Sequence, residues 1–434
     1  MKAYKTEIKL NKEQKHLFKL NQSACRFVYN LFISENKARH ERKEKYLNNF
    51  AFSKWLNNEY LPNNHDKIWI KEAYSKAVRN AIDNCHQAYQ RAFKNKKGFP
   101  KFKKASTDKT GIYFVRQSLS QPIKCVKHKI KIPKLGWVTL KEFSYLPTNE
   151  NQIINGTITK RANRYFISVI TDENFSGMSQ LNHNDGVGID LGIKELAVLS
   201  DGTQYANINK TKKVKKLEKR LKRQQRALSR KFEVRKKDKS IQTYKNIEKN
   251  KLEVEKCHFR LEQIRNAYIN KVIDDIIRKK PRFITIEDLA IKNMMKNKHL
   301  SKTIQNQKFY YFKQVLIQKA TKHNIEIREV GRFYPSSKMC SCCGKINKNL
   351  KLSDRIYKCD CGNILDRDVN AAINLRDSKE YSILNTVGLT EINDYGQCKN
   401  LSLVSAEGTN EDTLGEVVTS LRCTIPQKKL LSTN

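Results

Sequence analysis

Three acidic residues stand where one folded sheet could bring them together. Asp190 ends the apolar run GVGID, Glu287 ends a second apolar run, FITIE, and Asp368 lies in DRDVNAAINL, where a helix is expected to begin. A single acid at such a position is commonly a solvated strand end or a helix cap. Three acids on one sheet could hold two Mg²⁺ ions, which suit the hydrolysis of a phosphodiester. The sequence therefore predicts a two-metal Mg²⁺ site at these three carboxylates.

A second group of residues is typical of a metal site. Eleven cysteines are present, and five of them lie close together near position 350. Four of the five form two pairs, and a glycine follows each pair. Four thiolates from two such turns can surround Zn²⁺ with no open position, which makes the predicted site structural. The expected ligands are Cys340, Cys343, Cys359 and Cys361. The second pair is tighter than the usual CxxC, and Cys342 is a spare thiol that could compete.

The charge of the chain indicates its partner. Lys and Arg number 86 against 43 Asp and Glu, a formal net charge of +43 over 434 residues. Residues 377–434 are instead acidic overall, with eight acidic and five basic side chains. Between 210 and 239, sixteen residues are Lys or Arg and three are acidic, while apolar residues repeat at coiled-coil spacing. Such a chain is suited to binding a polyanion and unlike an ordinary metabolic enzyme. Nucleic acid is the expected partner, with an acidic lipid surface as the alternative.

The elements that must position these residues fall into two groups. Residues 3–9 alternate as a strand does, and Asn11 with Gln14 predicts the start of a helix that reaches about residue 45. A second helical block follows Pro62. Further strands are expected at 111–116, 122–132, 136–140, 153–160 and 164–171. We expect the first strand to join the later ones in a small β-barrel, with the helices as an insertion.

From Gly186 onward the pattern predicts an α/β sheet domain. Its expected strands are VGIDL, ELAVLS, a strand near Gln204, FITIE at 283–287 and IEIREV at 325–330, with long helices between them and one near 304–322. The segment 377–434 has no strong period and is expected to be a flexible tail. No apolar run is long enough to cross a membrane or to act as a secretory signal, which predicts a cytoplasmic protein.

Together these blocks resemble a known family. GVGIDLGIKELAVLSDG, ITIEDL and CSCCG…YKCDCGNILDRDVNAAINL are similar to the active-site blocks and zinc ribbon of TnpB, the OrfB-type protein of small insertion sequences, which is related to type V CRISPR effectors. KKGFPKFK at 96–103 and GRFYPSSKMC before the first cysteine pair also resemble this family, so the resemblance covers about residues 1–376. It implies that Asp190, Glu287 and Asp368 are the catalytic triad of a nuclease. Asp366 is the near rival of Asp368, which is preferred because the family's Asp stands two residues before Asn-Ala-Ala.

The resemblance also implies an α+β multidomain organisation. It consists of a wedge-like β-barrel domain at 1–10 and 108–175, a helical recognition insertion at 11–107, a RuvC-like nuclease domain of the RNase H fold at 184–338 and 363–376, a zinc ribbon at 339–362 and the acidic tail at 377–434.

Members of the family use a guide RNA from the transposon end to cleave matching double-stranded DNA beside a short flanking motif. The resemblance therefore implies guide RNA, target DNA, Mg²⁺ and Zn²⁺ as partners of this chain, which we expect to be a monomer. The segments where nucleic-acid contacts are expected contain Arg79, Asn80, Arg116, Gln117, Arg332, Tyr334, Ser336 and Lys338. Each of these could equally be an ordinary surface or loop-packing residue.

Other functions remain open from the sequence. Three acids on an RNase H fold also perform DNA strand transfer, so a transposase is one alternative. A guided repressor that has lost cleavage is a second, although all three acids are present here. GIDLG also resembles the phosphate-binding hairpin of actin-like ATPases, but the cysteine cluster and the charge have no role in such an enzyme. A zinc-ribbon adaptor would not need the acids.

Overall fold

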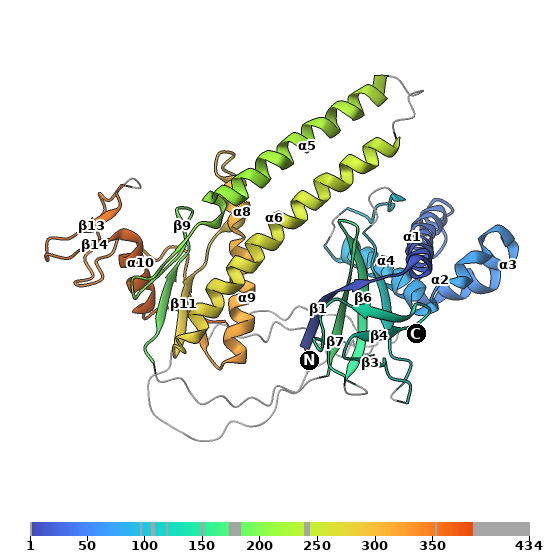
Figure 1. Ribbon diagram of the computed structural model, residues 1–434, viewed down its shortest axis with the longest axis horizontal. Coiled ribbons are helices and arrows are strands. Elements are labelled where there is room, and N and C mark those ends of the chain that lie inside the picture. The colour runs from blue at the N-terminus through green and yellow to red at the C-terminus, as the bar shows by residue number, and fades with distance from the viewer. Residues whose placement is uncertain are drawn as a thin grey trace, which may run out of the picture.

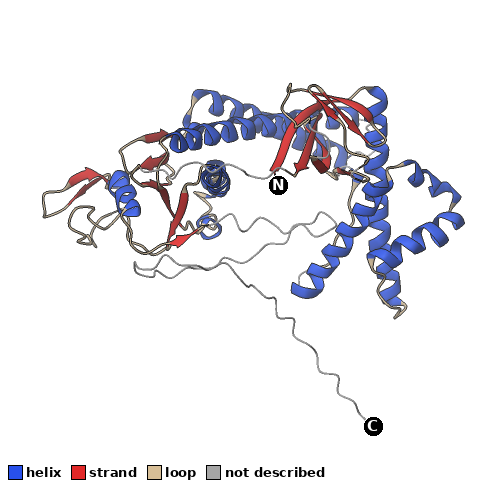
Figure 2. Cartoon of the chain, turned by 90° about the horizontal axis from the view of Figure 1, so that it is seen from below, coloured by secondary structure: helices blue, strands red, loops and turns tan. Residues whose placement is uncertain are grey.

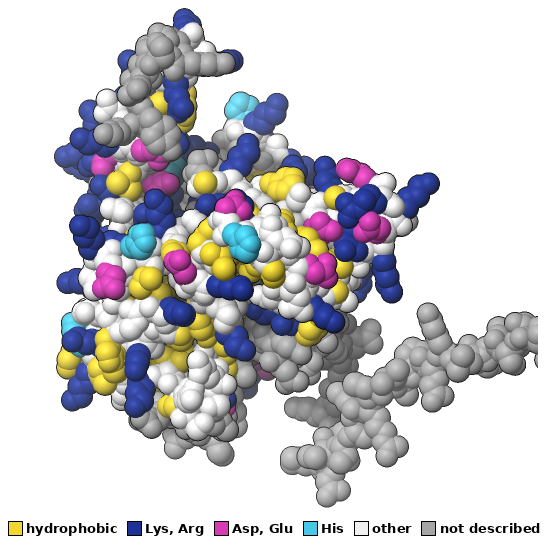
Figure 3. Space-filling model, turned by 90° about the vertical axis from the view of Figure 1, so that its right-hand side faces the viewer, with side chains coloured by type: hydrophobic (Ala, Val, Ile, Leu, Met, Phe, Trp, Pro, Cys, Tyr) yellow, Lys and Arg dark blue, Asp and Glu magenta, His cyan; other side chains and the backbone are white. Residues whose placement is uncertain are grey.

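The computed structural model has an α+β architecture with two separate β-sheets and their helices (Figure 1). It describes residues 2–95, 98–105, 109–118, 120–148, 152–172, 184–237, 244–351 and 354–384. Most of the acidic tail expected at 377–434 lies outside these residues. Figure 2 shows the strands in two groups at a distance from each other, with long helices between and beside them. Lys and Arg side chains are spread over the face of the molecule in Figure 3, as the net charge of +43 leads one to expect.

The first sheet contains the N-terminal strand at its centre. Its seven strands are β1 (Lys2–Lys9), β2 (Ile112–Val115), β3 (Cys125–Val126), β4 (Lys129–Ile132), β5 (Gly136–Leu140), β6 (Ile153–Arg161) and β7 (Arg164–Thr171), in the order β2-β6-β7-β1-β5-β4-β3. β1 is antiparallel to β7 on one side and to β5 on the other. The prediction that the N-terminal strand pairs with the later strands is confirmed.

The predicted closed barrel is wrong. Within the described residues, pairing stops at β2 on one edge of the sheet and at β3 on the other. Closure needs each strand to pair on both sides, and β3 has only two residues to offer. The single strand expected at 122–132 is instead two short strands, β3 and β4, which pair as a tight hairpin with Val126 opposite Lys129. The sheet is therefore open.

Helices fill the interval between β1 and β2. They are α1 (Lys12–Glu41), α2 (Asn49–Trp55), α3 (Leu61–Asn63) and α4 (Ser75–Asn95), with a π-helical turn at Leu56–Tyr60 and a 3-10 helix at His65–Glu72. The predicted start of α1 is confirmed, because the Asn11 side chain accepts from the Gln14 amide at 2.7 Å and the Gln14 side chain accepts from the Asn11 amide at 3.1 Å. The ring of Phe32, on α1, packs 4.8 Å from that of Phe52 in the helical core.

The second sheet has parallel strands at its centre. Its strands are β8 (Val187–Asp190), β9 (Glu195–Leu199), β10 (Gln204–Ala206), β11 (Phe283–Glu287), β12 (Glu326–Val330) and β15 (Ser382–Ile383), in the order β10-β9-β8-β11-β12-β15. β8, β11 and β12 run parallel, while β9, β10 and β15 are antiparallel to their neighbours. The start of the expected tail is thus part of the fold, since β15 pairs with β12 through Ile383 and Arg328.

Helices cover both faces of this sheet. They are α5 (Lys212–Lys237), α6 (Tyr244–Arg278), α7 (Ile291–Met294), α8 (Ser301–Gln307), α9 (Phe309–Lys322) and α10 (Arg367–Arg376). In Figure 1, α6 and α9 lie on one side of the strands and α10 on the other. The single helix expected at 304–322 is two helices, because Lys308 adopts a left-handed conformation with φ of 57°. None of the helices in the described ranges is both long and apolar enough to cross a bilayer.

The long helix α6 contacts both sheets. Near its C-terminal end, Ile273 and Ile276 are buried in the core of the second sheet. Near its middle, the ring of Phe259 lies 5.7 Å from that of Phe166 on β7, and Glu262 forms an ion pair with Arg161 on β6. One continuous helix therefore joins the second sheet to the first.

The antiparallel hairpin of α5 and α6 projects from the molecule (Figure 1). Basic side chains occupy one stripe of α5 at alternating spacings of four and three residues, which places them on one helix face. These residues are Lys212, Lys216, Lys219, Arg223, Arg226 and Arg230, and all six are exposed. The inner face of α5 packs on α6 and carries the acid Glu218, which pairs with Arg265 at 2.8 Å. The stripe is therefore a cationic surface about 27 Å long, at 1.5 Å per residue.

Candidate active site and cysteine cluster

Asp190 and Glu287 lie at the same edge of the second sheet. Each is the last residue of its strand, β8 and β11 respectively. The two strands are parallel neighbours, and Ile189 stands opposite Ile286. Because parallel strands end at the same edge of a sheet, the two carboxylates are placed beside each other. Hydrogen bonding within the sheet thus brings together two of the acids that the sequence singles out.

The third acid comes from helix α10, which packs directly on β8. A Cβ atom on Gly188 would lie 1.9 Å from the Ala372 carbonyl oxygen and 2.6 Å from the Arg376 amide nitrogen. Only glycine allows so close an approach of helix to strand. This contact sets the N-terminal end of α10, with Asp368 in its first turn, at the edge where β8 ends.

Asp366 and Asp368 have different roles in α10. The Asp366 side chain caps the helix, accepting from the amides of Asp368 at 2.9 Å and Val369 at 3.3 Å. Asp368 lies inside the first turn and repels Asp190 more strongly than Asp366 does. The cap occupies Asp366 with the helix itself, whereas the Asp368 carboxylate accepts no hydrogen bond within the described part of the chain.

The electrostatics of the site favour a bound cation. Burial, followed by repulsion from Asp368 and Glu287, raises the pKa of Asp190 to about 7, while Arg367 acts in the opposite direction. Burial and the adjacent Asp288 also raise the pKa of Glu287. Carboxylate oxygens that repel one another in this way form the donor set that a hard cation such as Mg²⁺ prefers. The donor type of these three side chains therefore suits such an ion.

Two buried asparagines join α10 to the chain that leads into the cysteine cluster. Asn370 accepts from the Ser341 amide at 3.0 Å and donates to the Met339 carbonyl at 2.7 Å. Asn374, one turn later, donates to the carbonyls of Ser336 and Met339, both at 2.7 Å. Both side chains are buried, so these hydrogen bonds are shielded from water. The helix that carries Asp368 is thus fastened to the first cysteine pair.

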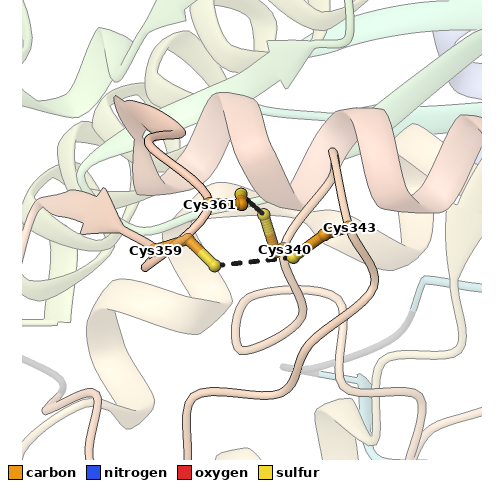
Figure 4. A group of neighbouring side chains, drawn as sticks. All are labelled: Cys340, Cys343, Cys359 and Cys361. Carbon is orange, nitrogen blue, oxygen red and sulfur yellow. Dashed lines mark hydrogen bonds between the residues drawn. The ribbon is translucent and has the colours of Figure 1, made fainter.

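The four predicted cysteine ligands converge (Figure 4). All four Sγ atoms lie within 4.8 Å of one another, with 3.7 Å between Cys340 and Cys361 and 3.6 Å between Cys343 and Cys359. Four sulfurs at tetrahedral Zn–S distances would be separated by about 3.8 Å, so the cluster fits Zn²⁺. Cys342 is exposed and lies outside this group.

The backbone turns after each cysteine pair are of the kind that a metal site needs. A glycine with positive φ follows each pair, Gly344 at 74° and Gly362 at 85°, and these turns fold the chain back toward the sulfurs. Burial acts to raise the pKa of Cys340, but hydrogen bonds from the Cys343 amide and the Asn363 side chain lower it to about 6. Short strands β13 (Ile356–Lys358) and β14 (Ile364–Asp366) pair beside the cluster and lead directly into α10.

Replacing Cys343 with Ser is expected to remove zinc binding and to lower the melting temperature, because three sulfurs leave the tetrahedral site incomplete. Zinc content of the purified protein and thermal unfolding measure these effects. Cys342→Ser, one residue away and outside the cluster, is the matched control and should retain zinc. Equal zinc content in both variants would contradict the assignment.

The remaining candidate residues are spread over two regions. On α4, Arg79 lies 3.6 Å from Asp83 and over the ring of Phe50, and Asn80 accepts from Asn84. Just after β2, Arg116 is partly buried and Gln117 is exposed. These four residues belong to the first sheet and its helices. They are not brought together with the carboxylates.

The other four candidates lie between β12 and the cysteine cluster. Arg332 forms an ion pair with Asp288 at 2.7 Å. Tyr334 donates to the Asn374 carbonyl at 3.1 Å, and the backbone of buried Ser336 accepts from Asn374, so both hold the loop against α10. Lys338 is exposed. Sequence reasoning missed Phe333, which stands among them, because a lone phenylalanine carries no spacing signal.

Family models match three parts of the chain. The helix-turn-helix domain of OrfB_IS605 matches residues 1–45, the OrfB_IS605 model, described as "Probable transposase", matches 168–298, and the Cas12f1-like TNB domain matches 309–375. The second and third matches contain all three carboxylates, and the third also contains the cysteine cluster.

Curated relatives resemble the chain over most of its length. A protein of Escherichia coli (strain K12) named "Putative RNA-guided DNA endonuclease InsQ" is 27% identical over 397 residues, which cover 86% of this chain and 91% of that protein. A Streptomyces pristinaespiralis protein with the same description, without the designation InsQ, is 25% identical over 356 residues, 81% of this chain and 82% of its own.

A solved structure shares the fold. It is a chain of the Cas12f1-sgRNA-target DNA complex, determined by cryo-EM, with a TM-score of 0.53 and 16% sequence identity. The alignment covers 85% of this chain and 84% of that chain. At this level of identity the likeness establishes a common Cas12-like architecture.

Proposed function

We propose, from the premise that the chain belongs to the OrfB family of IS605-type transposon proteins, that it is a metal-dependent DNA endonuclease directed by a guide RNA. The observation that carries the proposal is that Asp190 and Glu287 end neighbouring strands of a strongly basic chain and that both Glu287 and Asp368 repel the Asp190 carboxylate. The names of the two relatives supply the guided character, and the chain spans more than four fifths of each of them.

The second sheet and its helices form, in this proposal, a nuclease domain of the RuvC-like type. Its mixed sheet, with parallel β8, β11 and β12 at the centre, is consistent with an RNase H fold. The proposed domain boundaries are those expected from the sequence, with two changes. The first domain is an open sheet, not a barrel, and the nuclease domain extends to β15, which lies at the start of the segment expected to be the tail. The ribbon at 339–362 would hold structural Zn²⁺.

Asp190, Glu287 and Asp368 hold the catalytic cation in this proposal. Mg²⁺ bound there would polarise the scissile phosphate and lower the pKa of a water molecule. Asp190 must be ionised to bind the ion, and its raised pKa means that a proton competes with the metal near neutral pH. Hydrolysis forms a bond from the water oxygen to phosphorus and breaks the bond to the leaving oxygen, which takes up a proton.

The basic surfaces would hold the nucleic acid that the carboxylates cut. The cationic stripe on α5 offers six exposed side chains to a phosphate backbone. Arg79, Asn80, Arg116 and Gln117 are proposed to contact the flanking motif or the guide–target duplex. Arg332, which pairs with Asp288 next to Glu287, and the exposed Lys338 on the same loop are proposed to contact the cut strand. Base pairing with the guide would supply most of the sequence choice.

The test is reconstitution with the native RNA. The protein is purified with its genomic flanking sequence co-transcribed, the bound RNA is sequenced, and the complex is given a plasmid library with a matched target and randomised flanks in Mg²⁺. Guide-dependent cleavage beside one enriched flanking motif is expected. Guided binding without cleavage would indicate a repressor, and the absence of a discrete RNA would favour strand transfer or simple DNA binding.

A further inference from the structure

Phe333 is the most exposed large hydrophobic side chain in the described part of the chain, with 94% of its surface accessible. A phenylalanine side chain gains stabilisation when it is removed from water, and this one gains almost none. Its position therefore does not serve the folding of the chain.

The backbone on both sides of Phe333 is fixed. Gly331–Tyr334 form a turn in which the Tyr334 amide donates to the Gly331 carbonyl at 3.0 Å. Before Phe333, the guanidinium of Arg332 pairs with Asp288 at 2.7 Å. After it, the Tyr334 hydroxyl donates to the Asn374 carbonyl on α10 at 3.1 Å. An exposed ring on an anchored turn has lost much of its freedom before any ligand arrives, which lowers the entropy cost of binding.

The turn stands at the edge of the sheet where the carboxylates lie. β12 is parallel to β11, and Val330 pairs with Glu287. The Asp288 amide then donates to the Val330 carbonyl at 3.0 Å, so the two chains are still joined as they leave the sheet. Phe333 follows three residues after Val330, and its neighbour Arg332 is paired with the residue next to Glu287.

We infer that Phe333 is a nucleobase-binding site, on which an unpaired base of the DNA strand stacks beside the phosphate to be cut. The inference rests on the proposed function, because it places the reacting strand at the carboxylates. A phenyl ring offers a flat apolar face but no hydrogen bond, so it would accept any base and would not select a sequence. It needs a base whose face is open, which describes a single strand and not an intact duplex.

The charges around the ring suit this ligand. Arg332 and Lys338 are both exposed, and they flank Phe333 on the loop. They would attract the phosphates of the strand, while the ring holds one base. Stacking would fix the register of the strand relative to Asp190, Glu287 and Asp368. Phe333 would therefore act as a positioning residue and leave the chemistry to the acids.

The experiment uses DNA that carries 2-aminopurine, whose fluorescence is quenched by stacking. The full-length protein with its guide RNA is mixed, in buffer without Mg²⁺, with matched DNA labelled at successive positions across the cut site. Quenching is expected at one position and is expected to be lost with Phe333→Ala and kept with Phe333→Trp. In Mg²⁺, the single-turnover cleavage rate of Phe333→Ala should fall about 10-fold, the scale of one stacked base, and Phe333→Tyr should restore it.

Controls separate this inference from its alternatives. Phe143→Ala removes another exposed aromatic ring, 67% accessible, in the turn that follows β5 of the first sheet, and should change neither readout. The melting temperature of Phe333→Ala should equal that of the wild type. Unchanged quenching in Phe333→Ala, or an equal loss in Phe143→Ala, would overturn the inference.

A second arm remains informative if the proposed function fails. Labelled single-stranded DNA is bound to the protein in buffer without Mg²⁺ and without guide RNA, so the readout needs neither guiding nor cleavage. A wild type that cuts no DNA, but quenches through Phe333, would refute the nuclease and keep the stacking site. A wild type that cuts normally, but shows no quenching that depends on Phe333, would support the nuclease and refute the stacking site.

Discussion

Asp190→Asn is expected to abolish cleavage and, in metal-free buffer, to raise the melting temperature. The amide cannot supply the anionic oxygen that Asp190 would give to Mg²⁺, and the loss of such a catalytic group should lower the rate by at least about 1,000-fold. Binding of guide RNA and target DNA should be unchanged, since no nucleic-acid contact is assigned to this side chain. Single-turnover cleavage and filter binding measure the two effects.

The stabilisation follows from the raised pKa of Asp190. Its pKa is about 7 in the folded chain against an ordinary 3.8, so the folded state binds more protons between these values. The free energy of unfolding of the wild type therefore falls as the pH rises from about 4 to 7, and the loss is complete above 7. Asn stays neutral throughout. The gain in free energy of unfolding from Asp190→Asn, relative to the wild type, should be small near pH 4. It should reach at most about 4 kcal/mol at pH 8, since one pKa unit corresponds to about 1.4 kcal/mol.

Asp201→Asn is a control for which the expected change in melting temperature has the opposite sign. Although burial acts to raise the pKa of Asp201, its hydrogen bonds with Lys279 and Thr203 lower it, so this carboxylate stabilises the fold above its pKa. Its replacement should lower the melting temperature at pH 8. Mg²⁺ should raise the melting temperature of the wild type and of Asp201→Asn, but not that of Asp190→Asn. If Mg²⁺ stabilised all three proteins equally, the carboxylates would not be the metal site.

Gly188→Ala is expected to be the most damaging small substitution in the second sheet. Its Cβ would lie 1.9 Å from the Ala372 carbonyl oxygen, a backbone atom that cannot rotate away. Helix α10 must therefore move by more than an ångström, and Asp368 moves with it. We expect a loss of stability of about 1–3 kcal/mol, the usual cost of overpacking, and a cleavage rate about 100-fold lower, the scale of a 1 Å misplacement.

Gly331→Ala is the matched control for this substitution. Gly331 lies just after β12 of the same sheet, and a Cβ there would meet no heavy atom within 4 Å. Its melting temperature and cleavage rate should stay close to those of the wild type. A Gly188→Ala protein that melts and cuts like Gly331→Ala would show that the close packing of α10 on β8 does not position Asp368.

The strand-ending acids were predictable because their signal is local. An acid after an apolar run marks the end of a buried strand, and parallel strands end at a common edge. The paired cysteines were predictable for a similar reason, since short ligand spacing and a following glycine define each turn. What the sequence could not give is the distance between α10 and β8, because this distance depends on how Gly188 packs against a segment almost 190 residues away.

The wrong expectations concern weak or nonlocal pairing. The barrel fails to close because β3 is only two residues long, and alternation in the sequence does not reveal how many residues will pair. β15 went unnoticed because two residues, Ser382 and Ile383, carry no period. The helix expected at 304–322 is broken at Lys308, which adopts a left-handed conformation. A lysine in an otherwise helical pattern does not predict such a conformation.

Helix α6 sets a fixed length between the two halves of the molecule. It carries Phe259 against the first sheet and Ile273 inside the second, fourteen positions further along, which is about 21 Å of uninterrupted helix. A flexible linker would let the separation of the two sheets vary, but a helix packed against both sheets keeps that separation constant. If the first sheet and its helices bind the flanking motif, this constant separation would place the cut at a constant number of nucleotides from that motif, whatever the target sequence.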